Sequence, residues 1–99
     1  STIISSASDF NLTNFPNPFN PTTTISFSVT QNSDFVNLEV YNIKGQKVKQ
    51  LMNEQLPVGQ HSIEWNGKDT NNKSVSSGIY FYKISAGKTS AMKKMLLLK

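Results

Sequence analysis

The sequence predicts an all-β fold, an immunoglobulin- or fibronectin-like antiparallel β-sandwich of about seven short strands. Short segments with alternating apolar and polar residues are separated by turn residues at intervals of about eight to twelve positions. No segment has the apolar spacing of an amphipathic helix. A chain of 99 residues buries only about 60 to 65% of its unfolded surface, so we expect one domain with one core.

The first strand is expected at residues 10–12, followed by a proline-rich segment at residues 14–21. Each proline in that segment fixes its own φ and removes a hydrogen-bond donor, which predicts a stiff crossing between strands. We expect Phe15 and Phe19 to anchor the crossing to the core. Use of the prolines as a ligand for an aromatic groove is the less favoured interpretation, because it usually needs a longer exposed repeat.

The middle of the chain alternates as half-buried strands do, at residues 22–29, 36–41 and 61–65. Gly45 is predicted to supply the positive φ of a hairpin turn, after which the chain returns antiparallel. Val48 and Leu51 are three positions apart, which indicates a β-bulge or a strand end. A helical turn at residues 51–55 is the alternative.

Residues 78–99 are predicted to form a terminal β-hairpin, with a turn at residues 85–88. Large side chains on both faces of residues 79–84 predict that the hairpin strands lie inside a sheet. The chain then ends on its most apolar run, residues 95–98, followed by Lys99. An apolar end must be buried or recognised by a partner, because chain ends are otherwise polar and loose.

The alternation predicts one core built from all these segments. Its expected members are Ile25, Phe27, Val29, Val36, Leu38, Val40, Val48, Ile63, Trp65, Tyr80, Tyr82 and Leu97.

Three residues invite a functional interpretation, but a structural role explains each better. His61 has no partners at ligand spacing, so we expect it to be packed or at the rim of the core. Trp65 is in phase with Ile63, which favours the core over a sugar-binding platform. Asp69 begins a short similarity to a calcium loop, but Lys73 stands where the third oxygen ligand belongs. We therefore expect Asp69 to bind backbone amides of its turn.

The charge pattern argues against nucleic-acid binding. All ten cationic residues are lysines, and no arginine is present for bidentate contacts to bases or phosphates. Five of the lysines follow Gly78, where there is no acidic residue. Protection of sheet edges is the first explanation for Lys83, Lys93 and Lys94.

The sequence contains no paired carboxylates, nucleophile–base pair or phosphate loop, so we expect no enzyme activity and no cofactor or metal. Because it has no cysteine, a disulfide framework is excluded. Residues 1–9 are small and polar and are predicted to be a flexible linker from an upstream cargo domain. They resemble neither a signal peptide nor a membrane anchor.

Five motifs occur in order along the chain: FPNPFNPTTTI at 15–25, VYNIKGQKV at 40–48, GQHSIEWNG at 59–67, SGIYFY at 77–82 and KMLLLK at 94–99. Together, over residues 10–99, they resemble the type A C-terminal sorting domain of the type IX secretion system. The chain departs from that family at residues 69–73, where the family usually has a glycine and this chain has Asn71 and Asn72. Asparagine also tolerates a positive φ, so only the turn type is affected.

The resemblance implies a sorting signal rather than an enzyme. Such domains end exported proteins of Gram-negative bacteria, cross the periplasm and are read by the outer-membrane translocon without being inserted in the membrane. A sortase-like cysteine peptidase commonly removes them by cutting the preceding linker, here within residues 1–9. The cargo is then released or attached to the cell surface.

The resemblance also implies which residues the translocon recognises. They are Gly78 and Tyr80 in the penultimate strand and Lys94, Met95, Leu96, Leu97, Leu98 and Lys99 at the end. If the last strand lies at a sheet edge, a receptor can add a strand to it and place acidic groups on the lysines. Copies of the domain can pair through the same strand.

An accessory polysaccharide- or surface-binding module of a secreted enzyme is the alternative function. The sandwich fold and the expected exposure of Tyr41 permit it. Retained affinity of the isolated domain for a glycan distinguishes the two functions, because a sorting domain needs no such affinity.

Overall fold

The computed structural model describes residues 10–30 and 35–99. The predicted linker at residues 1–9, with its cleavage region, and the predicted turn at residues 31–34 lie outside this part. Seven strands form two antiparallel sheets, which confirms the all-β sandwich. The strands are β1 (Thr13–Phe15), β2 (Thr23–Val29), β3 (Phe35–Asn42), β4 (Lys47–Gln55), β5 (Gly59–Trp65), β6 (Gly78–Ala86) and β7 (Thr89–Leu97). No helix in the described ranges is long and apolar enough to span a membrane.

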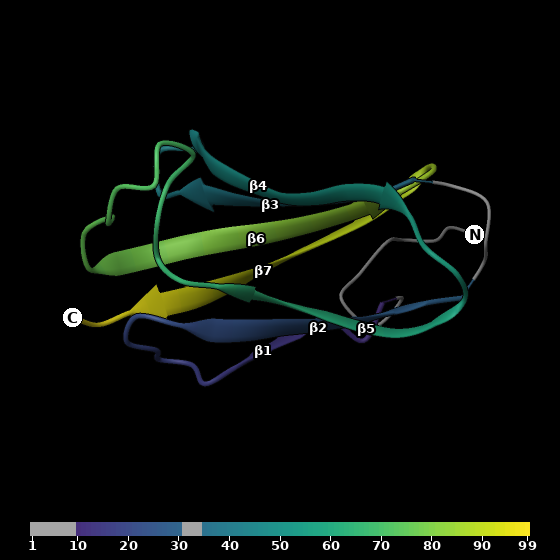
Figure 1. Ribbon diagram of the computed structural model, residues 1–99, viewed down its shortest axis with the longest axis horizontal. Coiled ribbons are helices and arrows are strands. Elements are labelled where there is room, and N and C mark those ends of the chain that lie inside the picture. The colour runs from purple at the N-terminus through teal and green to yellow at the C-terminus, as the bar shows by residue number, and fades with distance from the viewer. Residues whose placement is uncertain (1–9, 31–34) are drawn as a thin grey trace.

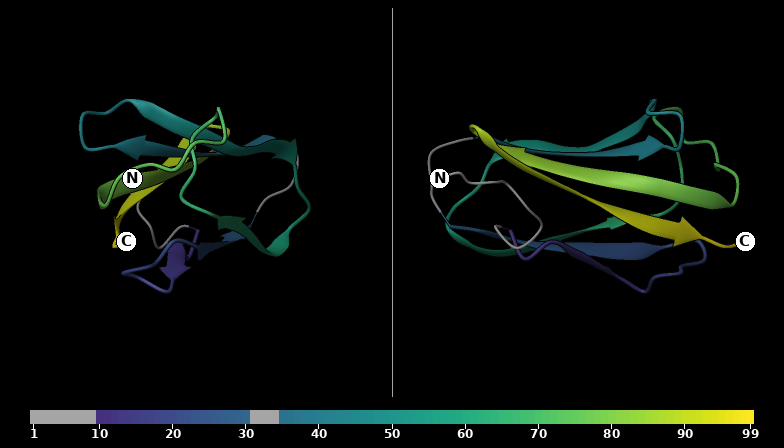
Figure 2. Two further views of the ribbon diagram at one scale, coloured as in Figure 1. Left: turned by 60° about the vertical axis from the view of Figure 1, so that its left-hand side comes forward. Right: turned by 180° about the vertical axis from the view of Figure 1, so that it is seen from behind.

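The two sheets have the strand orders β1-β2-β5 and β4-β3-β6-β7 (Figure 1). Strands β4 and β5 lie on one side of the sandwich, and β7 and β1 lie on the other (Figure 2). The terminal hairpin is confirmed as β6 and β7, but its predicted place inside the sheet is right only for β6. Strand β7 is an edge strand. Alternation reveals which faces of a strand are apolar, but it does not reveal whether another strand lies beside it.

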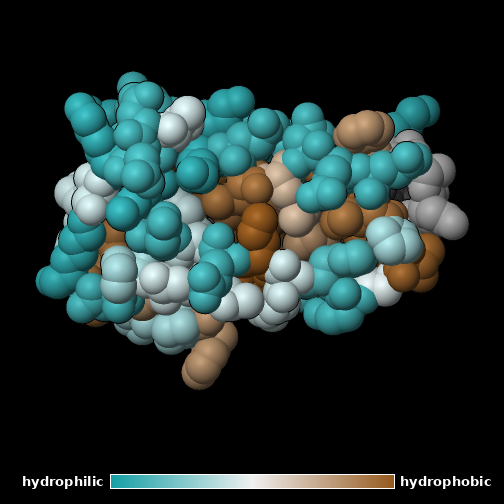
Figure 3. Space-filling model, viewed as in Figure 1, coloured by the Kyte–Doolittle hydropathy of each residue, from teal (hydrophilic) through white to brown (hydrophobic). Residues whose placement is uncertain are grey.

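The inner faces of the two sheets pack together as the alternation predicted. All predicted core residues are buried except Val48 and Ile63, which are partly buried and pack against the core. Because β4 and β5 contribute such half-covered side chains, apolar surface is visible between the two sheets on their side of the molecule (Figure 3). Several core residues were not predicted: Phe10, Leu12, Ile84, Ala91 and Met95.

The first strand begins later than predicted, at Thr13 instead of residue 10. Asn11 has a φ of 51°, which interrupts the extended backbone. The apolar residues on either side of it, Phe10 and Leu12, are still buried, and the backbone carbonyl of Phe10 accepts a hydrogen bond from the Ser28 amide (2.6 Å). Burial therefore extends beyond the strand, and the apolar pattern alone misplaced its boundary.

The expected β-bulge is present in β4, and the alternative helical turn at residues 51–55 is wrong. Two shifts of register against β3 leave Leu51 and Val48 without a partner residue. Each extra residue changes the face to which the following side chains point. As a result both residues pack against the core although they are three positions apart.

The turns follow the predicted chemistry. Gly45 has a φ of 83° in the β3–β4 turn. The Oδ1 atom of Asp69 accepts hydrogen bonds from the backbone amides of Asn71 (2.9 Å) and Lys73 (3.0 Å). Asn72 has a φ of 64°, so asparagine occupies the position with positive φ in this loop.

The proline-rich crossing is anchored by only one of its two phenylalanines. Phe19 is buried, but Phe15 is 81% exposed, so the prediction for Phe15 is wrong. Its neighbour Asn14 takes the inward position in β1, where its Oδ1 accepts a hydrogen bond from the Tyr82 hydroxyl (2.9 Å) and its Nδ2 donates to Thr23 Oγ1 (3.1 Å). A polar link between the two sheets thus occupies the place expected for an aromatic ring.

Burial of the Tyr82 hydroxyl makes stability dependent on pH in the alkaline range. Burial raises the pKa of Tyr82 to about 12, from an ordinary value of about 10. The folded state therefore holds the phenolic proton more tightly than the unfolded state does. This contribution is complete below about pH 10 and is lost as the pH rises through about 12. We expect the free energy of unfolding to fall over this range more steeply in the wild type than in Tyr82→Phe. If the denaturation midpoints of the two proteins fell by the same amount as the pH rises, Tyr82 would not be the source of this pH dependence.

Candidate recognition site at the terminal strand

The β6–β7 register brings the predicted recognition residues to one end of the sandwich. Gly78 pairs with Leu97, and Tyr80 pairs with Met95. Gly78 has a φ of 150°, a backbone conformation that side chains rarely allow. The predicted set is therefore contiguous in space, although it comes from two strands.

Three members of this set belong to the core. Tyr80, Met95 and Leu97 are buried, and Tyr80 lies edge-on to Trp65 with a distance of 5.5 Å between ring centroids. The Tyr80 hydroxyl donates a hydrogen bond to the backbone carbonyl of Ser76 (2.7 Å). In the folded domain these three side chains hold the strand in place and are not accessible to a partner.

The other members of the predicted set face outward. Lys94, Leu98 and Lys99 are exposed, and Leu96 is partly buried. The backbone amide of Lys99 donates to Ser77 Oγ (2.9 Å), which ties the segment after β7 to the residues before β6. The accessible part of the site is thus a pair of lysines and two leucines held in a defined position.

The proline-rich crossing covers the outer edge of the last residues of β7, which the sequence did not predict. The Phe19 amide donates to the Leu96 carbonyl (3.0 Å), and the Leu98 amide donates to the Phe19 carbonyl (2.9 Å). Asn17 Oδ1 accepts from the Leu96 amide (3.0 Å). Strand addition at residues 96–98 is therefore blocked in this state of the domain.

Further from its end, the edge of β7 is open as far as the described residues are concerned. Leu96 and Leu98 direct their backbone groups away from β6, toward the crossing. In an antiparallel pair, the residues whose backbone groups point away from the partner strand occur at every second position. Met92 and Lys94 therefore also direct their backbone groups away from β6. Within residues 10–30 and 35–99, no hydrogen bond reaches these outward groups of Met92 or Lys94.

The outer face of the four-stranded sheet carries a shallow apolar groove of about 350 Å³ beside this open edge. Its lining is mostly apolar and consists of Tyr41, Asn42, Ile43, Gly45, Phe81, Lys83 and Met92. Met92 is 57% exposed and belongs to both the groove and the open edge. Phe81 alternates with the predicted core residues Tyr80 and Tyr82, whereas the grouping of the lining residues depends on strand pairing.

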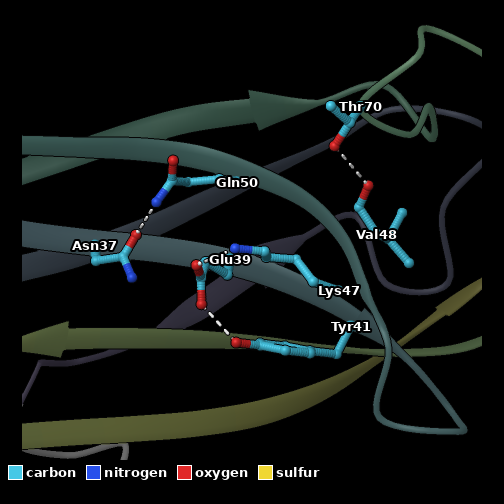
Figure 4. Close-up of polar contacts among 7 residues, drawn as sticks. All are labelled: Asn37, Glu39, Tyr41, Lys47, Val48, Gln50 and Thr70. Atoms are coloured by element: carbon cyan, nitrogen blue, oxygen red, sulfur yellow. Dashed lines mark hydrogen bonds and ion pairs between the residues drawn. The ribbon is translucent and has the colours of Figure 1, made fainter.

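Glu39 lies on the outer face of the four-stranded sheet and is bonded to Tyr41 and Lys47 (Figure 4). Glu39 accepts a hydrogen bond from the Tyr41 hydroxyl (2.5 Å) and forms an ion pair with Lys47 (3.2 Å). The bond from Tyr41 holds the pKa of Glu39 below its ordinary value, and the same bond raises the pKa of Tyr41. Lys83 and Lys94 are therefore left to set the charge at the β7 side of the face.

The residues interpreted structurally lie as expected. Trp65 is 1% exposed, and its Nε1 donates to the Lys68 carbonyl (2.9 Å), so it belongs to the core. His61 is partly buried, stacks on Phe27 at 5.8 Å between centroids and has its Nε2 2.8 Å from the Pro57 carbonyl. In the part of the chain that the structure describes, no three histidine, aspartate or glutamate side chains gather as metal ligands do.

Comparison with known proteins places this geometry in a family context. The family model of the FlgD Ig-like domain matches residues 14–90. FlgD from P. aeruginosa is similar in structure, with a TM-score of 0.60 and 25% identity over 76% of this chain. None of the curated proteins matches the sequence.

Two larger proteins from Porphyromonas gingivalis contain a similar fold. Dimeric latent PorU has a TM-score of 0.75 and 23% identity over 88% of this chain. PorZ, an essential surface component of the type IX secretion system, has a TM-score of 0.57 and 16% identity over 89% of this chain. The chain spans only 9% of PorU, 11% of PorZ and 57% of the P. aeruginosa FlgD chain.

Proposed function

The chain belongs to the FlgD Ig-like domain family. We propose that it is a sorting domain of the type IX secretion system. It directs an attached cargo protein across the outer membrane of a Gram-negative bacterium. The domain is a substrate of that system and carries no catalytic activity of its own. Its route runs through the periplasm to the cell surface or the medium.

The position of residues 94–99 is the observation that carries the proposal. Met95 and Leu97 are buried, so the segment is held firmly on the domain, while Lys94, Leu98 and Lys99 remain exposed beside it. A folded domain can thus present a fixed pattern of lysine and leucine side chains without unfolding. The five sequence motifs and the likeness of fold to parts of PorU and PorZ support the same interpretation.

The proposed partners follow from this function. The outer-membrane translocon reads the exposed residues, and a sortase-like cysteine peptidase cuts within residues 1–9 to release the upstream cargo domain. Recognition by charge requires acidic groups on the translocon, because the hairpin of β6 and β7 contains lysines and no acid.

Export of a fluorescent passenger tests the proposal. We fuse a signal peptide, the passenger and residues 1–99 and express the fusion in bacteria with and without a working type IX translocon. The wild-type fusion is expected at the cell surface only when the translocon is present. The double variant Lys94→Ala/Lys99→Ala is expected to lower surface export about tenfold, since it removes two exposed charges from the recognised segment.

The control for this experiment removes the same charge elsewhere. Lys73→Ala/Lys88→Ala changes two exposed lysines outside residues 94–99 and should leave export unchanged. Both double variants should unfold at the wild-type temperature, because surface substitutions alter stability by no more than about 0.5 kcal/mol. Equal export of the two folded variants would refute recognition by these lysines. A wild-type fusion that stays in the periplasm would refute the sorting function itself.

Substitution is preferable to truncation in this experiment. Removal of residues 94–99 also removes Met95 and Leu97 from the core. The loss of two large buried side chains costs several kcal/mol, at about 2 to 5 kcal/mol each, so a truncated domain is expected to unfold. Loss of its export would then not distinguish recognition from folding.

A polysaccharide- or surface-binding module is the second candidate function, and the outer-face groove is the observation that favours it. Tyr41 and Phe81 line this groove, and aromatic side chains in a shallow groove suit the apolar faces of sugars. Trp65 is not available for this role because it is buried. Binding of a cell-surface glycan by the isolated chain, lost in Tyr41→Ala, would support this candidate.

A further inference from the structure

We propose that the open edge of β7 binds an extended acidic segment of a partner protein, in which two adjacent acidic residues neighbour an apolar residue. The segment adds as a new strand beside residues 92–94. This inference rests on the proposed function for its biological meaning, since it describes the partner that reads the domain. Its physical basis is independent of export.

The backbone at the edge of β7 can pair with a further strand. Among the described residues, no hydrogen-bond partner reaches the outward amide and carbonyl groups of Met92 and Lys94. The crossing at Phe19 already occupies the edge at residues 96–98. An extended peptide satisfies such groups by strand pairing. The crossing limits where the new strand can lie, so residues 92–94 become the centre of the pairing.

The side chains determine the chemistry of the partner. Met92 and Lys94 lie on the outer face, in register with Lys83 and Phe81 of β6. Lys93 is in phase with the buried Ala91 and Met95 but is itself exposed. The two adjacent lysines therefore lie on opposite faces of one edge strand.

A paired strand must match this pattern residue by residue. Residues directly opposite each other in neighbouring strands lie with their side chains in contact. The residues opposite Lys94 and Lys93 should thus be acidic, and they are adjacent in the partner sequence because the two lysines are adjacent here. The residue opposite Met92 should be apolar, because it meets Met92 at the margin of the outer-face groove.

A second copy of this chain fits the edge poorly. Pairing of two β7 strands around residues 92–94 would bring lysines of one copy against lysines of the other, and like charges opposite each other destabilise a sheet. No acid follows Gly78 to compensate. The acidic segment of another protein is therefore favoured over self-association through the terminal strand.

Peptide binding to the 99-residue chain tests the inference. The probe is a short dye-labelled peptide of threonine and valine with Glu-Glu-Leu at its centre, and its counterpart carries Lys-Lys-Leu. Fluorescence anisotropy at low ionic strength should show at least about tenfold tighter binding of the glutamate peptide. In the charge-reversed variant Lys93→Glu/Lys94→Glu, the order of the two peptides should invert.

A backbone test accompanies the charge test. Met92→Pro removes the outward amide and leaves the bonds to β6, whereas Met92→Ala removes only the side chain. Binding of the glutamate peptide should be lost in the first variant and weakened a few-fold in the second. If Met92→Pro does not fold, charge reversal decides alone, because both lysines are exposed and their substitution leaves the core intact.

The inference would be overturned by equal affinity for both peptides, by no inversion on charge reversal, or by wild-type binding of a folded Met92→Pro. Binding to anionic lipid vesicles without binding of the glutamate peptide would assign the lysines to a membrane surface and overturn it also. Peptide binding without export of the passenger would refute only the sorting function. Export without peptide binding would refute only this inference.

Discussion

Leu97→Ala is expected to lower the free energy of unfolding by about 3 kcal/mol, whereas Leu98→Ala should change it by less than about 0.5 kcal/mol. Leu97 is fully buried, and its pairing with Phe19 closes the contact between β7 and the crossing. Truncation there leaves a cavity that the surrounding side chains fill only in part. Leu98, the next residue, is 49% exposed and leaves no cavity.

Urea denaturation followed by the fluorescence of Trp65 measures both variants, because this tryptophan is the only one in the chain and is buried. A similar decrease in the free energy of unfolding in both variants would show that Leu98 is also packed. The division of residues 95–98 into buried and accessible side chains would then be wrong. Leu97→Ala and Leu98→Ala also distinguish an effect on folding from an effect on recognition. Under the proposed function, Leu98→Ala should reduce export of a passenger while the domain keeps its stability.

Trp65→Ala is expected to have the largest effect on stability, a loss of about 4 kcal/mol in the free energy of unfolding. The indole packs against Phe19 at 5.7 Å and Tyr80 at 5.5 Å between ring centroids, so it joins the crossing to the β6 strand. Its removal also leaves the Lys68 carbonyl without its hydrogen-bond donor. Such a loss approaches the whole stability of many small domains, which is about 5 to 15 kcal/mol.

Phe15→Ala is the matched aromatic control, because Phe15 is 81% exposed in β1. It should change the free energy of unfolding by less than about 0.5 kcal/mol. Thermal melting followed by circular dichroism suits both proteins, since one of them lacks the tryptophan. A Trp65→Ala domain that melts near the wild-type temperature would contradict the core assignment. It would also reopen the interpretation of Trp65 as a binding platform.

Much of the fold is predictable from the sequence, because local chemistry decides it. The alternation in residues 22–29 marks the buried face of β2, where Ile25 and Phe27 are both inaccessible to solvent. Gly45 and Asp69 mark turns through their own backbone and hydrogen-bond preferences. The spacing of Val48 and Leu51 revealed a bulge, because only an extra residue lets both face the core.

The sequence predicted which residues belong to the candidate site, but not which of them are exposed. The motifs indicated residues 94–99 together with Gly78 and Tyr80, and the β6–β7 register brings these residues together. The motifs did not separate the buried Met95 and Leu97 from the exposed Lys94 and Leu98. That separation depends on which face of β7 meets the other sheet.

The all-β class, the turns and most of the core are encoded locally, because periodicity and turn preferences act between near neighbours in the chain. The edge position of β7 and the cover of its last residues by Phe19 arise from tertiary contacts. The same tertiary contacts bring Met92, Tyr41 and Phe81 together in one groove. These features depend on strand order and on contacts between residues far apart in sequence, and no local pattern encodes either.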